Sequence, residues 1–227
     1  MNEQMCKRLA ADFETLSPEK ILAKAVDLIP NLTFACSFGA EDMVILDMLM
    51  KVKEDVNVFY LDTDVLFPET YALIDQVMNR YEIPNLTRVR PKLTLAAQAK
   101  KHGAALWAKD PTACCNIRKV EPLIRHLKQY DGWITGIRRD QAATRAHAQA
   151  FELDKKFNLV KVNPLILWTE KDVWNYIRDH NVPYNPLHDQ GYPSIGCTHC
   201  TRPVRPGEDP RSGRWAGFSK TECGLHR

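Results

Sequence analysis

The chain has 227 residues, of which 44% are hydrophobic and 26% charged, and its formal net charge is only +3. This length and composition predict one sizeable domain with its own hydrophobic core. No apolar run is long enough to cross a membrane, and the first residues lack the apolar core of a signal peptide. We therefore expect a cytoplasmic protein with no membrane partner.

The predicted elements alternate between helices and strands along most of the chain. In chain order we expect helices at 4–15 and 18–29, a strand at 32–37, a helix at 41–52, a strand at 57–62, a helix at 68–81, a strand at 86–90, helices at 94–102 and about 113–129, strands at 132–137 and 159–164, and a helix at 169–180. Ser17 before Pro18, and later Thr169, are suitable residues to begin two of the helices. This alternation predicts an α/β fold with a parallel sheet and right-handed crossovers.

Four polar loops follow the carboxyl ends of predicted strands, where sheets of this type bind their ligands. They are SFGAED (37–42), LDTD (61–64), TRVR (87–90) and GIRRDQ (136–141). After about residue 181 the regular pattern stops, and the remainder is rich in proline, glycine, arginine and cysteine. So long an irregular stretch is expected to be either disordered or functional.

The SFGAED loop joins a strand to a helix through a glycine, so the free N–H groups of the helix could receive an anion. It is not a Walker A loop, because the lysine and the second glycine are missing. Taken alone, it also fits an ordinary turn in which Glu41 and Asp42 suit the positive end of the helix.

Arg138, Arg139 and Arg145 lie near the end of another predicted strand. Guanidinium groups suit phosphate and sulfate, because their planar N–H donors match the oxygens of these anions. The alternative is a solvated loop, in which arginines are common. Three arginines at a predicted ligand-binding edge make an anion site as plausible as that alternative.

Two cysteine pairs are the strongest local signal, namely Cys114-Cys115 and the CTHC motif of Cys197 and Cys200. Four thiolates can hold zinc or an iron–sulfur cluster. Neighbouring side chains on a helix point about 100° apart, so an adjacent pair serves one site only if the site is bulky or the helix is distorted. This favours a cluster. The alternative is a set of unrelated buried cysteines beside a redox CxxC motif.

Two basic residues follow the cysteine pair at helical spacing. Arg118 and Lys119 lie four residues after Cys114 and Cys115, so each base is expected to stack near a thiolate. Four thiolates around an iron–sulfur core leave a net negative charge, which nearby bases would offset.

The other cysteines differ among themselves. Seven cysteines cannot all be paired, and a cytoplasmic protein keeps its thiols reduced. Cys36 is expected to be a small buried residue in its strand, and Cys6 has no predicted role. Cys223 lies close to the chain end among basic residues, where His226 or an arginine could lower its pKa. The alternative for Cys223 is an incidental thiol on a solvated tail.

Taken together, SFGAED, LDTD, GIRRDQ, the CC pair, CTHC and the terminal ECGLH resemble the sulfonucleotide reductases of assimilatory sulfate reduction and cysteine biosynthesis. Within that family they resemble the adenylyl-sulfate (APS) reductase branch, from about residue 32 to the end. The resemblance implies a Rossmann-like parallel sheet of the adenine nucleotide alpha-hydrolase type. It implies an N-terminal helical segment (1–31), a nucleotide-binding domain with the cluster site (32–200) and a mobile catalytic tail (201–227), forming a single domain overall.

The resemblance also implies the site residues. One [4Fe–4S] cluster would be held by Cys114, Cys115, Cys197 and Cys200. The substrate would be bound by Ser37, Phe38 and Gly39 at the phosphosulfate, by Asp62 and Thr63 near the adenosine, and by Arg138, Arg139, Arg145, Arg211 and Arg214. Cys223 would be the nucleophile, supported by Lys119 and His226.

The activity that the resemblance implies is reduction of APS to sulfite and AMP through a sulfonated Cys223. Thioredoxin, or a glutaredoxin-like reductant, would then release the sulfite. We expect a homo-oligomer and no nucleic acid as partner.

Three alternatives remain open from the sequence. The first is a reductase that uses the 3′-phosphorylated nucleotide PAPS, or both nucleotides. The second is a tRNA-modifying enzyme of the ATP-pyrophosphatase type, although SFGAED lacks the second glycine and final serine of its loop and such an enzyme usually has a more basic surface. The third is a redox or metal sensor without catalytic activity, which would leave the arginine-rich strand ends unused.

Overall fold

A computed structural model of the protein describes residues 1–225. These residues form two compact units. The first unit consists of Met1–Tyr60, Asp75–Thr87 and Leu127–Tyr184, and the second begins with Leu61–Ile74 and Arg88–His126 and continues from Asn185. The division into segments expected from the sequence, at residues 31 and 200, stays a prediction.

The strands form one six-stranded sheet in the order β3-β2-β1-β4-β6-β5. Their bounds are β1 Leu32–Ala35, β2 Asn57–Leu61, β3 Leu86–Val89, β4 Gly132–Ile134, β5 Phe151–Asp154 and β6 Leu159–Val162. β1 pairs in parallel with β2 and with β4, and β4 pairs in parallel with β6. The predicted α/β fold with a mainly parallel sheet is therefore confirmed. The exception is β5, which the sequence analysis missed and which runs antiparallel to β6.

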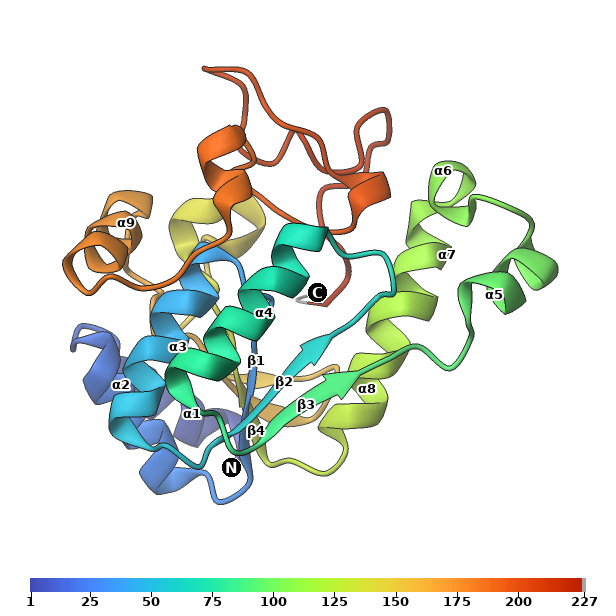
Figure 1. Ribbon diagram of the computed structural model, residues 1–227. Coiled ribbons are helices and arrows are strands. Elements are labelled where there is room, and N and C mark those ends of the chain that lie inside the picture. Colours follow the sequence, from blue (N-terminus) through green and yellow to red (C-terminus); the bar gives the residue numbers. More distant parts are fainter. Residues whose placement is uncertain (226–227) are drawn as a thin grey trace. The chain divides into compact units, whose positions relative to one another are not determined.

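The helices of the first unit cover the predicted ranges closely (Figure 1). They are α1 Glu3–Phe13, α2 Pro18–Leu28, α3 Ala40–Val52 and α9 Glu170–Asp179, while α4 Pro68–Tyr81 is shared between the units. α3 contacts α2 on one side and α9 on another. It is therefore buried nearly all round, which explains why the sequence EDMVILDMLM is apolar with so little helical periodicity.

The caps proposed from the sequence were partly correct. Thr169 accepts a hydrogen bond from the Asp172 amide, and the Asp172 side chain accepts from the Thr169 amide, so this pair forms a capping box. Ser17 is the N-cap of α2 and Pro18 its first residue, but the Ser17 side chain makes no capping hydrogen bond.

The second unit contains short helices around the cysteine pair. They are α5 Leu95–His102, α6 Leu106–Lys109, α7 Pro111–Cys115 and α8 Glu121–Leu127, with α8 continuing to the boundary of the first unit. The single helix predicted at 113–129 is wrong in detail, because a π-helical turn (η1, Asn116–Val120) separates α7 from α8. From residue 182 to residue 225, the helical elements are two short 3₁₀ turns, η4 Pro186–Gln190 and η5 Thr198–Cys200, and this part of the chain has no named strand, as the loss of pattern predicted.

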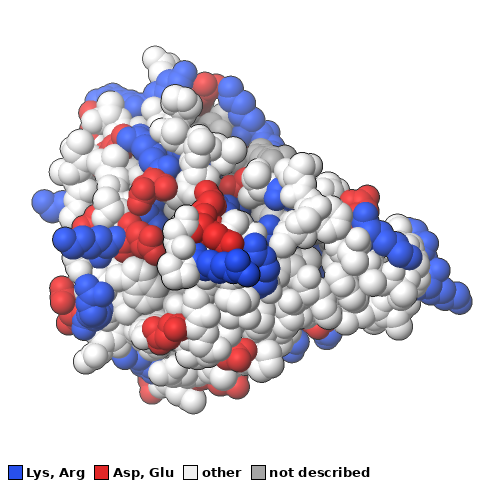
Figure 2. All heavy atoms as spheres, turned by 90° about the horizontal axis from the view of Figure 1, so that it is seen from above, with Lys and Arg blue, Asp and Glu red and all other residues white. Residues whose placement is uncertain are grey.

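Acidic and basic side chains are interspersed on the face shown in Figure 2. Elsewhere in the chain, a few ion pairs have helical spacing, such as Lys7 with Glu3 and Lys51 with Asp47. Among residues 1–225, no helix is both long enough and apolar enough to cross a membrane.

Candidate active site

The loop after β1 has a constrained backbone in the first unit. Phe38 adopts a φ of +60°, which is uncommon for a residue with a side chain. Its ring is only 2% exposed and packs edge-on against Tyr60, with ring centroids 5.6 Å apart. This packing holds the backbone of Ser37, Phe38 and Gly39 in a tight turn, and Gly39 is the N-cap of α3. The predicted anion-binding loop therefore ends at a helix N-terminus.

Asp42 organises this loop from inside, a role that the sequence analysis did not assign. Its Oδ2 accepts hydrogen bonds from the Ser37 amide at 2.6 Å and from the Ser37 hydroxyl at 2.5 Å. The Gly136 amide at the end of β4 also donates to this carboxylate. A methyl group on residue 136 would lie 2.2 Å from Asp42 Oδ1, so this close approach requires glycine. Burial raises the pKa of Asp42 to about 6, and the hydrogen bonds from Ser37 partly offset that rise.

We predict that Asp42→Asn changes how stability depends on pH. Because the pKa is about 6 in the folded chain against an ordinary 3.8, the folded state binds the proton more tightly. The contribution of Asp42 to the free energy of unfolding therefore falls as pH rises from about 4 to about 6, by about 3 kcal/mol. Asparagine has no proton to lose. Urea unfolding from pH 4 to 7 should show the original chain losing this stability relative to the variant, and parallel curves would contradict the assignment.

The three arginines near the end of β4 all have partners in the first unit. Arg138 is 4% exposed, and its guanidinium bonds Glu41 at 2.9 Å and Asp140 at 2.8 Å. Arg139 bonds Glu14, and Arg145 donates to the Gln141 side chain. Arg138 is thus the arginine closest to the loop after β1, since Glu41 is in the first turn of α3. Substrate binding by any of the three stays a prediction.

Asp62 and Thr63 are completely buried in the second unit. Asp62 accepts hydrogen bonds from the Tyr71 hydroxyl at 2.8 Å and from Arg88 Nε at 2.6 Å. Thr63 Oγ1 lies 3.3 Å from the Cys197 sulfur. The LDTD motif is therefore next to the CTHC motif in space, a neighbour that its position in the sequence did not indicate.

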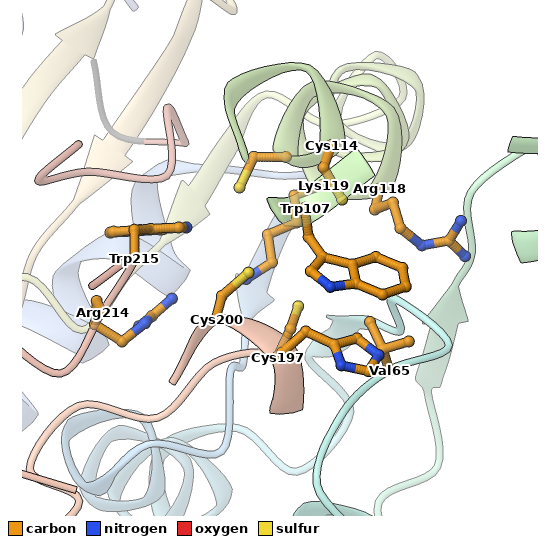
Figure 3. Close-up of a pocket in the computed structure, with 11 residues that line it drawn as sticks. Val65, Trp107, Cys114, Arg118, Lys119, Cys197, Cys200, Arg214 and Trp215 are labelled. Carbon is orange, nitrogen blue, oxygen red and sulfur yellow. The ribbon is translucent and has the colours of Figure 1, made fainter. Parts of the chain in front are cut away.

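The four predicted ligand cysteines line one cavity (Figure 3). Its remaining lining residues are Val65, Trp107, Arg118, Lys119, His199, Arg214 and Trp215. The rings of Trp107 and His199 are stacked, with centroids 4.1 Å apart and planes 8° apart. This stack joins α6 to the CTHC turn, and neither ring was singled out from the sequence. Segments distant in sequence thus converge on the cysteines.

A π-helical turn, η1, follows the adjacent cysteines directly. Its wider turn distorts the helix just after Cys115. Arg118 points away from solvent and is 2% exposed. Its guanidinium donates to the Thr63 carbonyl at 2.6 Å, to the Gln98 side chain at 3.0 Å and to the Asp64 carboxylate. Arg118 therefore fixes the loop beside Cys197 through the backbone of Thr63.

Lys119 also faces the cavity (Figure 3). Burial lowers the pKa of its ammonium group, but negative charge on Cys197 and Cys223 raises it, and the net shift is upward. Lys119 is therefore a positive charge between the cysteine cavity and the thiol near the chain end.

Four thiols are the donors that this cavity offers to a metal group. All seven cysteines of the chain are free thiols. Among residues 1–225, no three His, Cys, Asp or Glu side chains are close enough to hold one metal ion. Burial and the neighbouring cysteines raise the pKa of Cys200 to about 11, and burial likewise raises the pKa of Cys114. Bare thiolates are thus unfavourable here, and metal coordination would stabilise them.

The other two cysteines lie in the first unit, as the sequence analysis expected for Cys36. Cys36 follows β1 and is 2% exposed, and burial raises its pKa well above the ordinary value. Cys6 is 1% exposed on α1.

The irregular segment after Cys200 returns to the CTHC turn. Arg202 donates to the Gly213 carbonyl, and Trp215 donates to the Cys200 carbonyl, at 3.0 Å in each case. Arg214 lies against Gly196, where a methyl group would be 2.3 Å from its guanidinium. Its Nη1 donates to the Ser194 hydroxyl at 3.1 Å, whereas its buried Nε has no partner among the described residues. Arg214 therefore brings to the cavity an N–H donor, its Nε, that has no partner among the described residues.

The segment that carries Cys223 lies against α7 and η1. Lys220 Nζ is 3.4 Å from the Thr112 hydroxyl. A methyl group on Gly224 would be 3.6 Å from the Val120 side chain, so the backbone passes close to the π-helical turn. Cys223, which lies between these two contacts, is therefore close to Lys119. The predicted role of His226 lies outside the described residues.

Residues 31–203 match the family model of the phosphoadenosine phosphosulfate reductase domain. An adenosine 5′-phosphosulfate reductase of Shouchella clausii is 48% identical over 225 residues, covering 96% of this chain and 93% of that protein. Adenosine 5′-phosphosulfate reductase 2 of Bacillus subtilis is 52% identical over 197 residues, covering 87% and 84% of the two chains.

Solved structures agree with these matches. The crystal structure of a phosphoadenylyl-sulfate reductase from Candida auris superposes with a TM-score of 0.80 at 35% identity, covering 89% of this chain and 98% of that one. An FMN adenylyltransferase from Candida glabrata has a TM-score of 0.59 at 14% identity, covering 88% and 72%, and shares the fold alone. The chain therefore belongs to the phosphoadenosine phosphosulfate reductase family, whose members are oxidoreductases that act on sulfonucleotides.

Proposed function

We propose that the protein reduces adenosine 5′-phosphosulfate (APS) to sulfite and AMP, with Cys223 as nucleophile and thioredoxin or a glutaredoxin-like protein as reductant. The relatives at about 50% identity named as APS reductases support the substrate. The observation that carries the mechanism is the position of the Cys223 segment, held between Lys220 on Thr112 and Gly224 against Val120. This position places a thiol from the chain end beside Lys119 and the four-cysteine cavity.

In the first step the thiolate of Cys223 attacks the sulfur of the sulfuryl group. A sulfur–sulfur bond forms, the bond between that sulfur and the phosphate oxygen breaks, and AMP leaves with the electron pair. In the second step a thiolate of the reductant attacks Cys223 Sγ, and sulfite leaves with the electron pair of the sulfur–sulfur bond. The second thiol of the reductant then releases Cys223. The two reductant thiols become a disulfide, and the substrate sulfur gains two electrons.

Positive charge is needed because an anionic thiolate approaches an anionic substrate. Lys119 and Arg214 both line the cavity, and the buried Nε of Arg214 has no partner among the described residues. Fixed cations and N–H donors lower the repulsion and stabilise the charge that develops on the leaving phosphate. We expect the substrate's phosphosulfate to contact these two groups.

Cys114, Cys115, Cys197 and Cys200 would hold one [4Fe–4S] cluster, because all four line the same cavity and four thiolates are the ligand set of such a cluster. When bound, such a cluster supplies a fixed negative charge beside Lys119. The reaction draws its electrons from thiols, so the role of these residues is to hold and orient. Thr63 Oγ1, at 3.3 Å from Cys197 Sγ, and Arg118 behind it fix the orientation of one of the four thiols.

The proposal is tested by incubating the purified, iron-containing protein with APS labelled in its sulfur and mapping the label by mass spectrometry. We expect one SO₃ adduct of roughly 80 daltons on the peptide that contains Cys223, with release of one AMP. Reduced thioredoxin should then remove the label as sulfite. Label on any other cysteine, or AMP release without an adduct, would contradict the proposed mechanism.

A second candidate substrate is the 3′-phosphorylated nucleotide PAPS. The structural similarity to a phosphoadenylyl-sulfate reductase favours this candidate, alone or together with APS. The same assay with PAPS in place of APS separates the possibilities, because a reductase specific for APS should form the adduct much more slowly with PAPS.

A further inference from the structure

A buried ion pair holds the segment that carries Cys223. Arg211 Nη2 lies 3.0 Å from Glu222 Oε2 and 2.8 Å from the Thr221 carbonyl oxygen. The Glu222 side chain is only 5% exposed and that of Arg211 is 20% exposed. The carboxylate next to the proposed nucleophile is thus enclosed against a cation from another part of the chain. No role was predicted for Glu222 from the sequence.

A second ion pair in the same stretch provides a comparison. Arg202 Nη1 lies 3.3 Å from Glu208 Oε2, but these side chains are 46% and 34% exposed. Exposed pairs of this kind contribute little, because water screens the charges and the side chains lose freedom. Breaking a buried pair is costly, because one charge is left buried without compensation. Breaking the Arg211–Glu222 pair should therefore destabilise this stretch more than breaking the Arg202–Glu208 pair.

The buried pair fixes the backbone that leads into Cys223. Thr221 and Glu222 are the two residues immediately before Cys223, so both contacts of Arg211 set the direction in which the backbone enters that residue. Arg211 is itself fixed, because its amide donates to Asp209 at 2.7 Å and its carbonyl accepts from the Arg214 amide at 2.9 Å. The pair thus connects the thiol segment to the loop that returns to the CTHC turn.

We propose that Glu222 is a positioning residue which, through its ion pair with Arg211, seats Cys223 beside Lys119. This role in the reaction rests on the proposed function of Cys223. The thiol must dock on the substrate and later meet a protein reductant, so the same pair sets how often the segment opens. Removing the Glu222 carboxylate shifts the equilibrium of this segment from the docked state towards an open state.

The first test uses the full chain without nucleotide, so that its result does not depend on the reaction. Glu222→Ala and Glu222→Gln are compared with Glu208→Gln as the matched control. Alkylation of Cys223 by iodoacetamide, followed by peptide mapping, measures opening, and hydrogen exchange of the 216–225 peptide measures it independently. We expect both rates to rise about tenfold or more in Glu222→Ala, less in Glu222→Gln, and not at all in the control.

The second test asks whether opening matters for the reaction. At saturating APS, the single-turnover rate of adduct formation should fall about tenfold in Glu222→Ala, while AMP affinity stays within about twofold of the original. A general loss of structure would lower both the single-turnover rate and the AMP affinity. If the alanine variant folds poorly, the glutamine variant, which retains the side-chain volume, takes its place. Unchanged alkylation and exchange in both variants would overturn the proposal. If the original chain forms no adduct, the proposed function fails, whereas the labelling result still decides whether Glu222 holds the segment.

Discussion

Replacing Cys223 by serine should abolish sulfite formation, with a fall of more than about a thousandfold. A serine hydroxyl is essentially un-ionised at neutral pH, whereas a thiol is readily ionised and a stronger nucleophile. Serine also cannot form the sulfur–sulfur bond from which a reductant thiol displaces sulfite. Two separate steps therefore fail in this variant. Sulfite release with thioredoxin and AMP release without it measure the two steps.

The same variant should keep its iron and its nucleotide affinity. Cys223 is not among the residues that line the four-cysteine cavity, and Ser37, which is predicted to bind the substrate, belongs to the first unit. Cys6→Ser is a matched control, because Cys6 is a buried thiol on α1 and its pKa is raised by burial. It should leave turnover unchanged. Loss of iron from Cys223→Ser, or persistent sulfite formation, would show that the two cysteine roles are not separate.

The sheet and its loops were predictable because they depend on local patterns. Strand-to-helix alternation predicts parallel pairing, and parallel pairing brings the loops after β1 and β4 to one edge. The strand β5 was missed because its sequence, FELD, is short and half polar, and its pairing with β6 is antiparallel. A strand at the edge of a sheet has a weaker apolar signal than a central one.

The sequence predicted a helix at the CC pair, but it did not indicate that a π-helical turn interrupts that helix. An adjacent pair was expected to need a bulky group or a distorted helix, and η1 distorts the helix directly after Cys115. Where Arg118 points could not be read from helical spacing, because the wider π turn carries its side chain to Thr63, Gln98 and Asp64. Side-chain direction depends on the turn type, and the sequence pattern did not distinguish a π turn from an α turn.

Most features of the site that the sequence did not reveal are contacts between residues far apart in the chain. Asp42 looked like a favourable charge at a helix start, yet it joins Ser37 to Gly136 across two strands. Glu222 looked like one acid in a charged tail, yet it is buried against Arg211. Both cases depend on burial and pairing, which one sequence alone does not provide. The close approach of Gly136 to Asp42 leaves a sequence signal, a glycine at a strand end, but no indication of its partner.

Replacing Cys200 by serine should remove most of the iron. A [4Fe–4S] cluster has one protein ligand for each iron, so the loss of one thiolate leaves one iron exposed to water and reductants. Cys200 is on the short turn η5, which the Trp215 amide fixes through the Cys200 carbonyl. A serine there keeps the backbone in place but offers a harder and more weakly donating oxygen. Iron per chain should therefore fall from about four towards zero, together with the visible absorbance.

Cys36→Ser is the matched control for this loss. Cys36 is buried, as Cys114 and Cys115 are, but it follows β1 in the first unit and is not among the residues that line the cavity. Iron and acid-labile sulfide should stay at the original level in that variant, although its stability should fall because a hydroxyl replaces a buried thiol. A full iron count in Cys200→Ser would show that Cys200 is not a ligand. Equal loss in both variants would instead show that iron retention reports overall stability, and the four-cysteine assignment would then need each ligand to be tested at matched stability.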